Sequence, residues 1–540
     1  MRKFLFFLSL LSLSFGGGRE LYLKHCAGCH GEDRLGRTAP PLFSLPPFFS
    51  LGPDEKIYQI VKRGTVGMPP FAHLKEEEIK AIVEFIKQPV EKVSWEEERI
   101  KGSVELLEVD KVDIKRPSEY TLVVERGAQR VWVMEGEELL GKFPFSNVHG
   151  GIKFSKKAER AYIPSRNGWV GLYSYKDGTL KRVRACIYLR NIALSRDDQV
   201  LAVSCWLPPS LVFFDGELQL KKVEKVEGRV NAIYEFKDGF VFVFRDSPLM
   251  GLVSKSLKID YKGLDAKLED FIIDPLEKYL IGSTKDSLRV YELEDSLRLV
   301  KEFKTAGLPH LASAYFWYSG GDFYFATPQL GKRQLSLWKA YRWEHIKDIP
   351  LDGEGFLARS NYKTPYVWID NSTDTLTLLH KRTFELKKLI PSHGKRATHT
   401  EFNGDGSLAY VSVYEKDGSL VVYDAITLKK LKEYPASLPA GKYNFINKNR
   451  ALEGAFLGYQ VFMEKCWGCH HTTEKAFGPP LKWSAQNREK ALLMAQILDP
   501  ENTYRLLNYE RNAMPKIKLS EEELSALMKF LEALKDGWMD

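Results

Sequence analysis

Cys26-Ala27-Gly28-Cys29-His30 stands near the start of the chain, and the pattern returns near its end as Cys466-Trp467-Gly468-Cys469-His470. Two cysteines separated by two residues and followed by histidine form the attachment signature of c-type haem. The thiols lie one helical turn apart and can form thioethers to the two vinyl groups of a haem, while the histidine ligates the iron. We therefore predict two covalent haem c groups. Their attachment cysteines are Cys26, Cys29, Cys466 and Cys469, and their histidine ligands are His30 and His470.

The flanks of the two motifs also match each other, which indicates a duplicated domain. Each motif is followed by a Pro-Pro-Leu segment, then by a loop containing Met-Pro, and then by an apolar helical pattern with an acidic start. A methionine thioether is one of the second axial ligands that cytochromes c use, so Met68 and Met514 are the predicted sixth ligands of the two irons. Residues 18–90 and 452–540 resemble small all-α class I cytochrome c domains along their whole length.

Residues 1–17 read as a secretory signal peptide. A basic start, Arg2-Lys3, precedes an apolar run from Phe4 to Leu13 and then small residues. The run is too short to cross a bilayer, and an uncleaved membrane anchor is the weaker alternative. Maturation of c-type haem takes place outside the bacterial cytoplasmic membrane, a property of that family, so we expect a periplasmic protein.

Composition bounds the remaining possibilities. The chain has 540 residues, enough for two or three domains, and its net charge of +8 is spread along the sequence rather than gathered in arms. It therefore gives no support for a nucleic-acid partner. Four of the six cysteines belong to the haem motifs. Cys186 and Cys205 remain, either as a disulfide, which an oxidising compartment permits, or as two buried free thiols on neighbouring strands.

The region between the haem domains has a different pattern. Residues 91–118 are charged and without a clear fold signal, so we expect a linker. From 119 to 447, short apolar runs such as Gly239–Phe244 and Ser419–Tyr423 are bounded by Asp-Gly and Asn-Gly turns. Recurring all-strand units of about 40 residues are typical of a β-propeller, here with roughly seven or eight blades. A pair of large β-sandwiches is the weaker alternative.

Polar residues interrupt the starts of several expected strands, in an order that resembles the cytochrome cd1 family. The segments that carry the resemblance are Val148-His149, Arg166-Asn167-Gly168, Trp206 to Val212, Leu308-Pro309-His310, Glu401 to Gly406 and Gly441 to Phe445. In that family a haem c domain precedes an eight-bladed propeller that holds noncovalent haem d1.

The resemblance implies a set of site residues in the propeller. His149 would be the proximal iron ligand and His310 a distal active-site residue. Arg166 would offer its planar guanidinium to the negatively charged periphery of the haem. Trp206 would also contact the cofactor, and Arg396 with its neighbour Lys395 is a looser candidate for binding it.

Two positions separate the activities within this family. The nitrite reductases use a second distal histidine, but the matching region here, Phe356 to Tyr362, has none, and Asn361 does not titrate near neutrality. In contrast, Thr398-His399-Thr400-Glu401-Phe402 resembles the paralogous haem d1 biosynthesis proteins, among them dehydrogenases of dihydro-haem d1. His399 would then be a catalytic base or orient one, and the haem c groups would carry electrons away.

These observations predict a periplasmic oxidoreductase with a central all-β propeller between two cytochrome c domains. Its expected ligand is haem d1 or its dihydro precursor, and its expected partners are periplasmic electron-transfer proteins. A nitrite reductase acting on nitrite, a dihaem electron carrier without catalysis, and a haem-binding protein without turnover are the alternatives. The second haem c domain belongs to neither cd1 pattern, and whether the chain forms a homodimer stays open.

Overall fold

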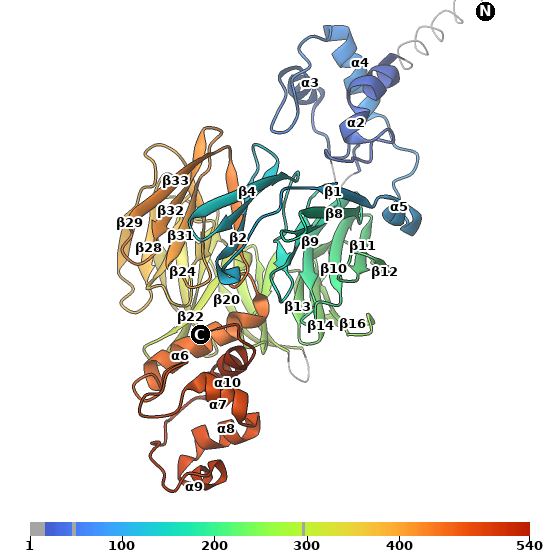
Figure 1. Ribbon diagram of the computed structural model, residues 1–540. Helices are drawn as coiled ribbons and strands as arrows, with labels where there is room; N and C mark the ends of the chain where they lie inside the picture. Colours follow the sequence, from blue (N-terminus) through green and yellow to red (C-terminus); the bar gives the residue numbers. More distant parts are fainter. Residues whose placement is uncertain (1–16, 46–49, 294–296, 540) are drawn as a thin grey trace, which may run out of the picture.

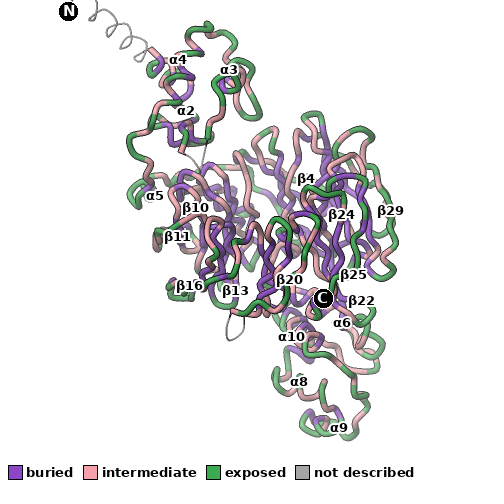
Figure 2. The backbone as a smooth tube through the Cα atoms, turned by 180° about the vertical axis from the view of Figure 1, so that it is seen from behind, coloured by how far each residue is buried: buried purple, intermediate pink, exposed green. Residues whose placement is uncertain are grey.

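The computed structural model describes residues 17–45, 50–293 and 297–539, with a ring of sheets in the centre and a helical domain at each end (Figure 1). Figure 2 shows that buried residues are concentrated in the sheets of the ring. The expected signal peptide lies outside the described residues except for its last one. Within the described ranges, no helix is both long and apolar enough to span a membrane.

The N-terminal domain is a small helical unit. It contains helical residues 17–25, followed by α2 (Ala27–His30), α3 (Asp54–Arg63) and α4 (Glu76–Lys87). The apolar residues of α4 recur at helical spacing, and Ile79, Ile82 and Ile86 are buried against Tyr22 and Cys26. The expected acidic start of α4 forms its first turn, where negative charge favours the positive end of the helix dipole.

The connection from residue 91 to residue 118 is ordered. It contains α5 (Glu97–Gly102), β1 (Glu105–Glu108) and a short 3-10 turn, η1 (Pro117–Glu119). Strand β1 pairs antiparallel with β8 of the ring. The segment expected to be a linker therefore adds a fifth strand to one blade and fixes the N-terminal domain to it.

Eight antiparallel sheets form the ring, which confirms the predicted eight-bladed propeller. In chain order they contain β5 (Lys153–Phe154), β6 (Arg160–Pro164), β7 (Trp169–Ser174) and β8 (Thr179–Arg184); β9 (Tyr188–Leu194), β10 (Leu201–Leu207), β11 (Pro209–Phe214) and β12 (Leu220–Lys225); β13 (Val230–Phe236), β14 (Gly239–Phe244), β15 (Leu249–Val253) and β16 (Ile259–Gly263); β17 (Asp270–Ile273), β18 (Tyr279–Thr284), β19 (Ser287–Glu292) and β20 (Arg298–Lys304); β21 (Leu308–Pro309), β22 (Tyr315–Ser319), β23 (Asp322–Leu330), β24 (Gln334–Lys339) and β25 (Glu344–Pro350); β26 (Ala358–Arg359), β27 (Tyr366–Asp370), β28 (Leu376–His380) and β29 (Leu386–Leu389); β30 (Ala397–Phe402), β31 (Leu408–Val413), β32 (Gly418–Asp424) and β33 (Lys430–Ala436).

The eighth blade closes the ring with strands from both ends of the domain. It contains β34 (Pro439–Asn444) and then β2 (Tyr120–Glu125), β3 (Arg130–Glu135) and β4 (Glu138–Pro144), with Thr121 opposite Asn444 in the pairing. The first strands of neighbouring blades contact one another, as β9 does β13 and β30 does β34. These strands therefore line the axis of the ring, and polar residues at their ends face a common centre.

The C-terminal domain is again helical. Its elements are η3 (Arg450–Leu452), α6 (Glu453–Lys465), α7 (Leu481–Asn487), α8 (Lys490–Leu498), α9 (Pro500–Thr503), η4 (Tyr504–Leu507) and α10 (Glu521–Lys535). Helices α6 and α10 pack closely at Gly458, where an added Cβ would lie 2.0 Å from the carbonyl oxygen of Ala526. Gly18 meets the carbonyl oxygen of Ala81 in the same way, at 2.4 Å. The same close approach of first and last helix thus recurs in both domains.

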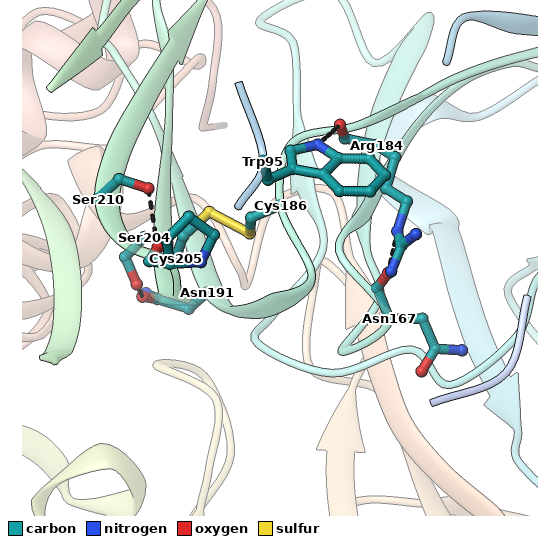
Figure 3. The surroundings of a disulfide bond; sticks show 9 residues. Trp95, Asn167, Arg184, Cys186, Asn191, Ser204, Cys205 and Ser210 are labelled. Atoms are coloured by element: carbon teal, nitrogen blue, oxygen red, sulfur yellow. Dashed lines mark hydrogen bonds between the residues drawn. A yellow bond between two sulfur atoms is a disulfide. The ribbon is translucent and has the colours of Figure 1, made fainter. Parts of the chain in front are cut away.

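Cys186 and Cys205 form a disulfide, which decides between the two alternatives for this pair (Figure 3). Cys205 lies in β10 and Cys186 just before β9, and both side chains are fully buried. The bond ties the entry of this blade to its second strand.

We expect the double replacement Cys186→Ala/Cys205→Ala to lower the free energy of unfolding of the propeller by about 3 kcal/mol, because the bond closes a short loop in the unfolded chain. Denaturant unfolding followed by tryptophan fluorescence measures this. Ser210→Ala is a matched control, since Ser210 lies opposite Cys205 and donates a hydrogen bond to the carbonyl oxygen of Pro208; its cost should be about 1 kcal/mol. Equal losses in the two proteins would contradict the prediction.

Candidate haem and tetrapyrrole sites

The C-terminal domain contains an apolar cavity of about 650 Å³ lined by Cys466, Cys469, His470 and Met514. The Nδ1–H of His470 donates to the carbonyl oxygen of Pro479 at 2.9 Å, so the ring is held with Nε2 as its free nitrogen. Such a hydrogen bond behind a ligating histidine fixes the tautomer that a metal requires. Both attachment thiols, the histidine and the methionine therefore meet around one space, a donor set that fits haem c.

The N-terminal domain repeats this arrangement. The Nδ1–H of His30 donates to the carbonyl oxygen of Pro40 at 2.7 Å, and burial lowers the pKa of His30, which keeps its imidazole neutral. Cys26 and Met68 belong to the same apolar cluster, while Cys29 is exposed. The Pro-Pro-Leu segment thus has a use that the sequence pattern alone did not reveal: its first proline carbonyl orients the histidine.

The N-terminal domain docks beside the region of the propeller that carries His149 and Arg166. The carbonyl oxygen of Thr38 accepts hydrogen bonds from Asn167 Nδ2 at 2.7 Å and from Ser146 Oγ at 3.0 Å. Arg184, buried in the ring, donates to the carbonyl oxygens of Leu35 and Gly36 at 2.6 Å each. Burial lowers the pKa of Arg184 to about 10. The residues that follow the first haem motif therefore rest directly on the propeller.

A cavity of about 460 Å³ lies at the centre of the ring, and His149, His310 and His399 all line it. They come from three different blades, and the loops and strand ends that carry them meet only because the ring is closed. Positively charged residues surround the same space, namely Lys153, Arg190, Arg359, Lys442, Lys448 and Arg450. The cavity therefore suits a flat, acidic ligand that can also bind a histidine.

His149 is held as a neutral imidazole. Its Nε2 accepts a hydrogen bond from Arg166 Nη2 at 2.6 Å, so the buried Nδ1 carries the ring proton. Burial, followed by the charges of Arg166 and Arg190, lowers the pKa of His149 to about 3. A neutral ring whose Nε2 has a lone pair, next to Gly150 and Gly151 in the cavity wall, fits a site for an iron-bearing macrocycle.

His310 and His399 are joined through one aromatic ring. Phe356 lies 4.8 Å from His310 and 6.4 Å from His399 between ring centroids. His310 Nδ1 donates to the carbonyl oxygen of Phe356 at 2.6 Å, which orients the imidazole. The two histidines predicted to be catalytic, His310 as a distal residue and His399 as a base, therefore lie on either side of one ring from a third blade.

His399 has an unusual backbone conformation. Its φ of +51° lies in the left-handed region, at a point where the pairing of β30 with β31 shifts register. Bulges of this kind re-aim side chains near functional sites. Burial, and then the charge of Lys442, keep the pKa of His399 well below its usual value. Lys442 donates a hydrogen bond to the carbonyl oxygen of His399, and burial lowers the pKa of Lys442 to about 7.

The three residues predicted to bind the cofactor, Arg166, Trp206 and Arg396, are not among those that line the central cavity. Arg166 is directly behind His149 and also donates to the hydroxyl of Tyr188 at 2.7 Å. Trp206 stacks on Tyr188 at 5.6 Å between centroids, and the guanidinium of Arg190 lies over the ring of Trp206. Arg396 is exposed, with its guanidinium over the ring of Tyr414. The structure thus places Arg166 and Trp206 behind the residues that line the cavity, and Arg396 on the exposed surface.

The segment Phe356 to Tyr362 matches the one that carries a second distal histidine in nitrite reductases. Here it contributes Arg359 to the cavity wall. Arg359 pairs with Glu401, at 3.1 Å from Nε to Oε1. Asn361 is buried in the packing between blades instead, where its Nδ2 donates to Asn447 Oδ1 at 2.7 Å.

Sequence reasoning missed the charged residues Arg190, Arg359, Lys442 and Lys448 of the wall. Each is a single cation in or close after an inner strand, a weak signal in a chain with 79 lysines and arginines. Lys442 stood in a segment that the resemblance already marked, Gly441 to Phe445, and its position between a glycine and a tyrosine was the one available hint.

Comparison with known proteins agrees with this geometry. Residues 116–448 match the cytochrome D1 heme domain family. The chain belongs to this family. Residues 15–86 match the family of cbb3-type cytochrome c oxidase subunit III, and residues 455–535 match cytochrome c. The two end domains are therefore haem c domains, and the propeller between them is of the type that holds haem d1.

Within the family, the similarity is high to dihydro-heme d1 dehydrogenase of Pseudomonas aeruginosa, with 34% identity over 81% of this chain and 95% of that protein. A solved structure of dihydro-heme d1 dehydrogenase NirN in complex with DHE matches with a TM-score of 0.74 and 33% identity, covering 80% of this chain and 99% of that one. Nitrite reductase of Stutzerimonas stutzeri is 22% identical over 79% of this chain and 92% of its own length.

The two methionines allow a separate test of each haem c site. We expect Met514→Ala to lower the reduction potential of the second haem c by on the order of 0.1 V, because axial ligands set potentials over ~0.8 V and a thioether raises them. The first haem should keep its potential. Spectroelectrochemical titration measures both potentials. Met68→Ala is the matched variant, in which the potential of the first haem c should fall and that of the second should stay unchanged. Two unchanged potentials in Met514→Ala would show that Met514 is not a ligand.

Proposed function

We propose that the chain is a periplasmic dihydro-haem d1 dehydrogenase that passes the electrons to its own haem c groups. The observation that carries this proposal is the meeting of His149, His310 and His399 in one cationic cavity. The relatives named above support the same activity. The N-terminal segment expected to be a signal peptide supports the periplasm, and periplasmic electron-transfer proteins are the partners that would reoxidise the haem c groups.

The cavity residues have distinct proposed roles. His149 is the iron ligand, since its imidazole is neutral and its Nε2 has a lone pair that can bind iron in place of the hydrogen bond from Arg166. Arg190 and Lys448, among the cations of the wall, bind the carboxylates of the acidic tetrapyrrole. Arg166 holds the His149 ring in place through its hydrogen bond to Nε2 until the ligand binds. When bound, the tetrapyrrole supplies the conjugated system into which a new side-chain double bond extends.

His399 is the proposed proton acceptor. Its depressed pKa leaves the imidazole unprotonated near neutral pH, the form that a general base requires. Glu401, two residues further on the same strand, lines the cavity and pairs with Lys448 at 2.5 Å. This ion pair borders the same space and, with the pair that Glu401 makes with Arg359, holds the carboxylate in the cavity wall. His310, fixed by Phe356, confines the substrate on the distal side.

The decisive experiment is an anaerobic titration of the oxidised protein with dihydro-haem d1, with the tetrapyrrole and haem c bands recorded together. We expect conversion to haem d1 with reduction of haem c in proportion. Binding without conversion would contradict the dehydrogenase and point to the nitrite reductase, whereas absence of binding would leave a dihaem electron carrier.

The pKa of Lys442 leads to a pH prediction. Above about pH 7 Lys442 loses its charge, and the pKa of His399, which that charge depresses, rises. We therefore expect conversion to speed up as pH rises from 6 to 8. In Lys442→Gln, which keeps a hydrogen-bond donor without the charge, the rate should be nearly independent of pH and higher than wild type at pH 6. A stopped-flow series measures this; an unchanged profile in the variant would contradict it.

A further inference from the structure

The C-terminal haem domain forms part of the wall of the propeller cavity. Arg450, Glu453 and Phe456 line the cavity together with the residues of the inner strands, and all three belong to the segment that begins the C-terminal domain. In Figure 1 this domain lies against the end of the ring opposite to the N-terminal domain. The central cavity is thus bounded at one end by the second cytochrome c domain.

The contact between this domain and the ring is specific. Gln460 on α6 accepts a hydrogen bond from the Tyr318 backbone N–H at 2.8 Å and donates one to the carbonyl oxygen of Tyr362 at 3.0 Å. The Tyr318 hydroxyl donates to Glu523 of α10 at 2.6 Å, in a buried position. Buried polar groups on both sides are therefore paired across the interface, as in a fixed contact rather than a loose tether.

A run of packed aromatic rings leads from the cavity wall into the second haem domain. The edge of Tyr459 meets Tyr362, in the cavity wall, at 5.1 Å between centroids, and Tyr459 contacts Phe462 at 6.2 Å. The carbonyl oxygen of Phe462 accepts the backbone N–H of Cys466 at 2.8 Å. Phe456 stacks on Tyr362 beside this run, with centroids 4.6 Å apart and planes at 2°. Tyr362, Tyr459 and Phe462 thus form a series of ring contacts that ends at a haem-attachment cysteine.

We propose that the second haem c is an electron outlet of the propeller cavity, and that the contact of Tyr362 with Tyr459 is the coupling contact. Electron tunnelling through a protein weakens steeply with distance and with gaps in packing, and this run crosses the domain boundary through rings in contact. The direction of electron flow in this proposal rests on the proposed function.

Converting a C–C single bond into a double bond releases two protons and two electrons. His399 takes up one proton and the other passes to solvent. Two ferric haem c groups would accept one electron each.

The test measures electron exchange rather than turnover. The first haem c is removed by Cys26→Ala/Cys29→Ala, so that the remaining haem c signal belongs to the second domain, and the protein is loaded with haem d1, the stable product. After a reducing flash, the exchange between tetrapyrrole and haem c is followed by absorbance. We expect Tyr459→Leu, in this background, to slow the exchange by about tenfold or more, because the lost ring leaves a gap in the packed path.

Two further variants separate coupling from docking. Tyr459→Phe keeps the ring and should exchange at the parental rate. Tyr318→Phe removes the hydrogen bond to Glu523 but leaves the aromatic run intact, and should also exchange at the parental rate. An unchanged rate in Tyr459→Leu would overturn the proposal, as would equal slowing in Tyr318→Phe. Fast exchange in a protein that fails to convert dihydro-haem d1 would support this electron route and contradict the dehydrogenase alone.

Discussion

Replacing His149 with alanine is expected to weaken tetrapyrrole binding by about a hundredfold or more, because even partners behind a metal ligand cost up to that factor when removed. The variant loses the only proposed bond to the iron. It also leaves Arg166 without the imidazole nitrogen that accepts its hydrogen bond, so the wall of the site loses order as well as a ligand. Titration of the protein with haem d1, followed by its absorption bands, measures the affinity.

The control for this variant is His393→Ala. His393 is an exposed histidine in the loop before β30, and its removal should leave the affinity unchanged. Both variants should keep full covalent haem c content, which would show that the two cytochrome c domains have matured normally. Wild-type affinity in His149→Ala would mean that another group, such as His310, binds the iron.

Replacing His399 with alanine is expected to slow conversion of dihydro-haem d1 by roughly 10²–10⁴-fold, the usual contribution of a general base. Binding should change far less, because the affinity comes from His149 and from the cations of the wall. Single-turnover kinetics under anaerobic conditions separate the two effects: the rate of haem c reduction should fall while the tetrapyrrole still binds.

The backbone at residue 399 allows a sharper comparison. Since φ there is +51°, His399→Asn is the better-tolerated variant, because asparagine adopts the left-handed region more readily than alanine. The neutral amide of asparagine cannot accept a proton near neutral pH, so the two variants should be equally slow although they differ in local strain. A rate in His399→Asn close to that of wild type would exclude His399 as the base and direct attention to Glu401.

The fold was predictable because its signals are local. A haem-attachment motif is contiguous, and blades are marked by short apolar runs separated by turns. Matching glycines such as Gly18 and Gly458 could be aligned from sequence, and the structure shows that each permits a carbonyl oxygen to approach a helix. The three histidines of the cavity were also predictable, because each stands in a short segment that resembles one family.

The electrostatics of the cavity could not be predicted in this way. Arg359 lies in a segment whose sequence is notable only for its lack of a histidine. Its position in the wall depends on the pairing of only two residues in β26. The lowered pKa of Lys442 depends on burial by several blades, which no local pattern records. For the same reason the sequence left the disulfide undecided and gave no sign that α6 lines the cavity, since both depend on contacts between distant segments.

The closure of the ring by β34 and β2 orders the biogenesis of the protein. Thr121 and Asn444 pair across nearly the whole length of the propeller, and contacts so distant in sequence form slowly because the intervening chain must first be ordered. The first cytochrome domain needs none of these contacts for its core, so its haem can be attached while the rest of the chain is still emerging. Lys442 and Tyr443 reach the cavity only with β34. The tetrapyrrole pocket is therefore the last part of the structure to be completed, and a newly made chain can carry covalent haem before it can bind its acidic ligand.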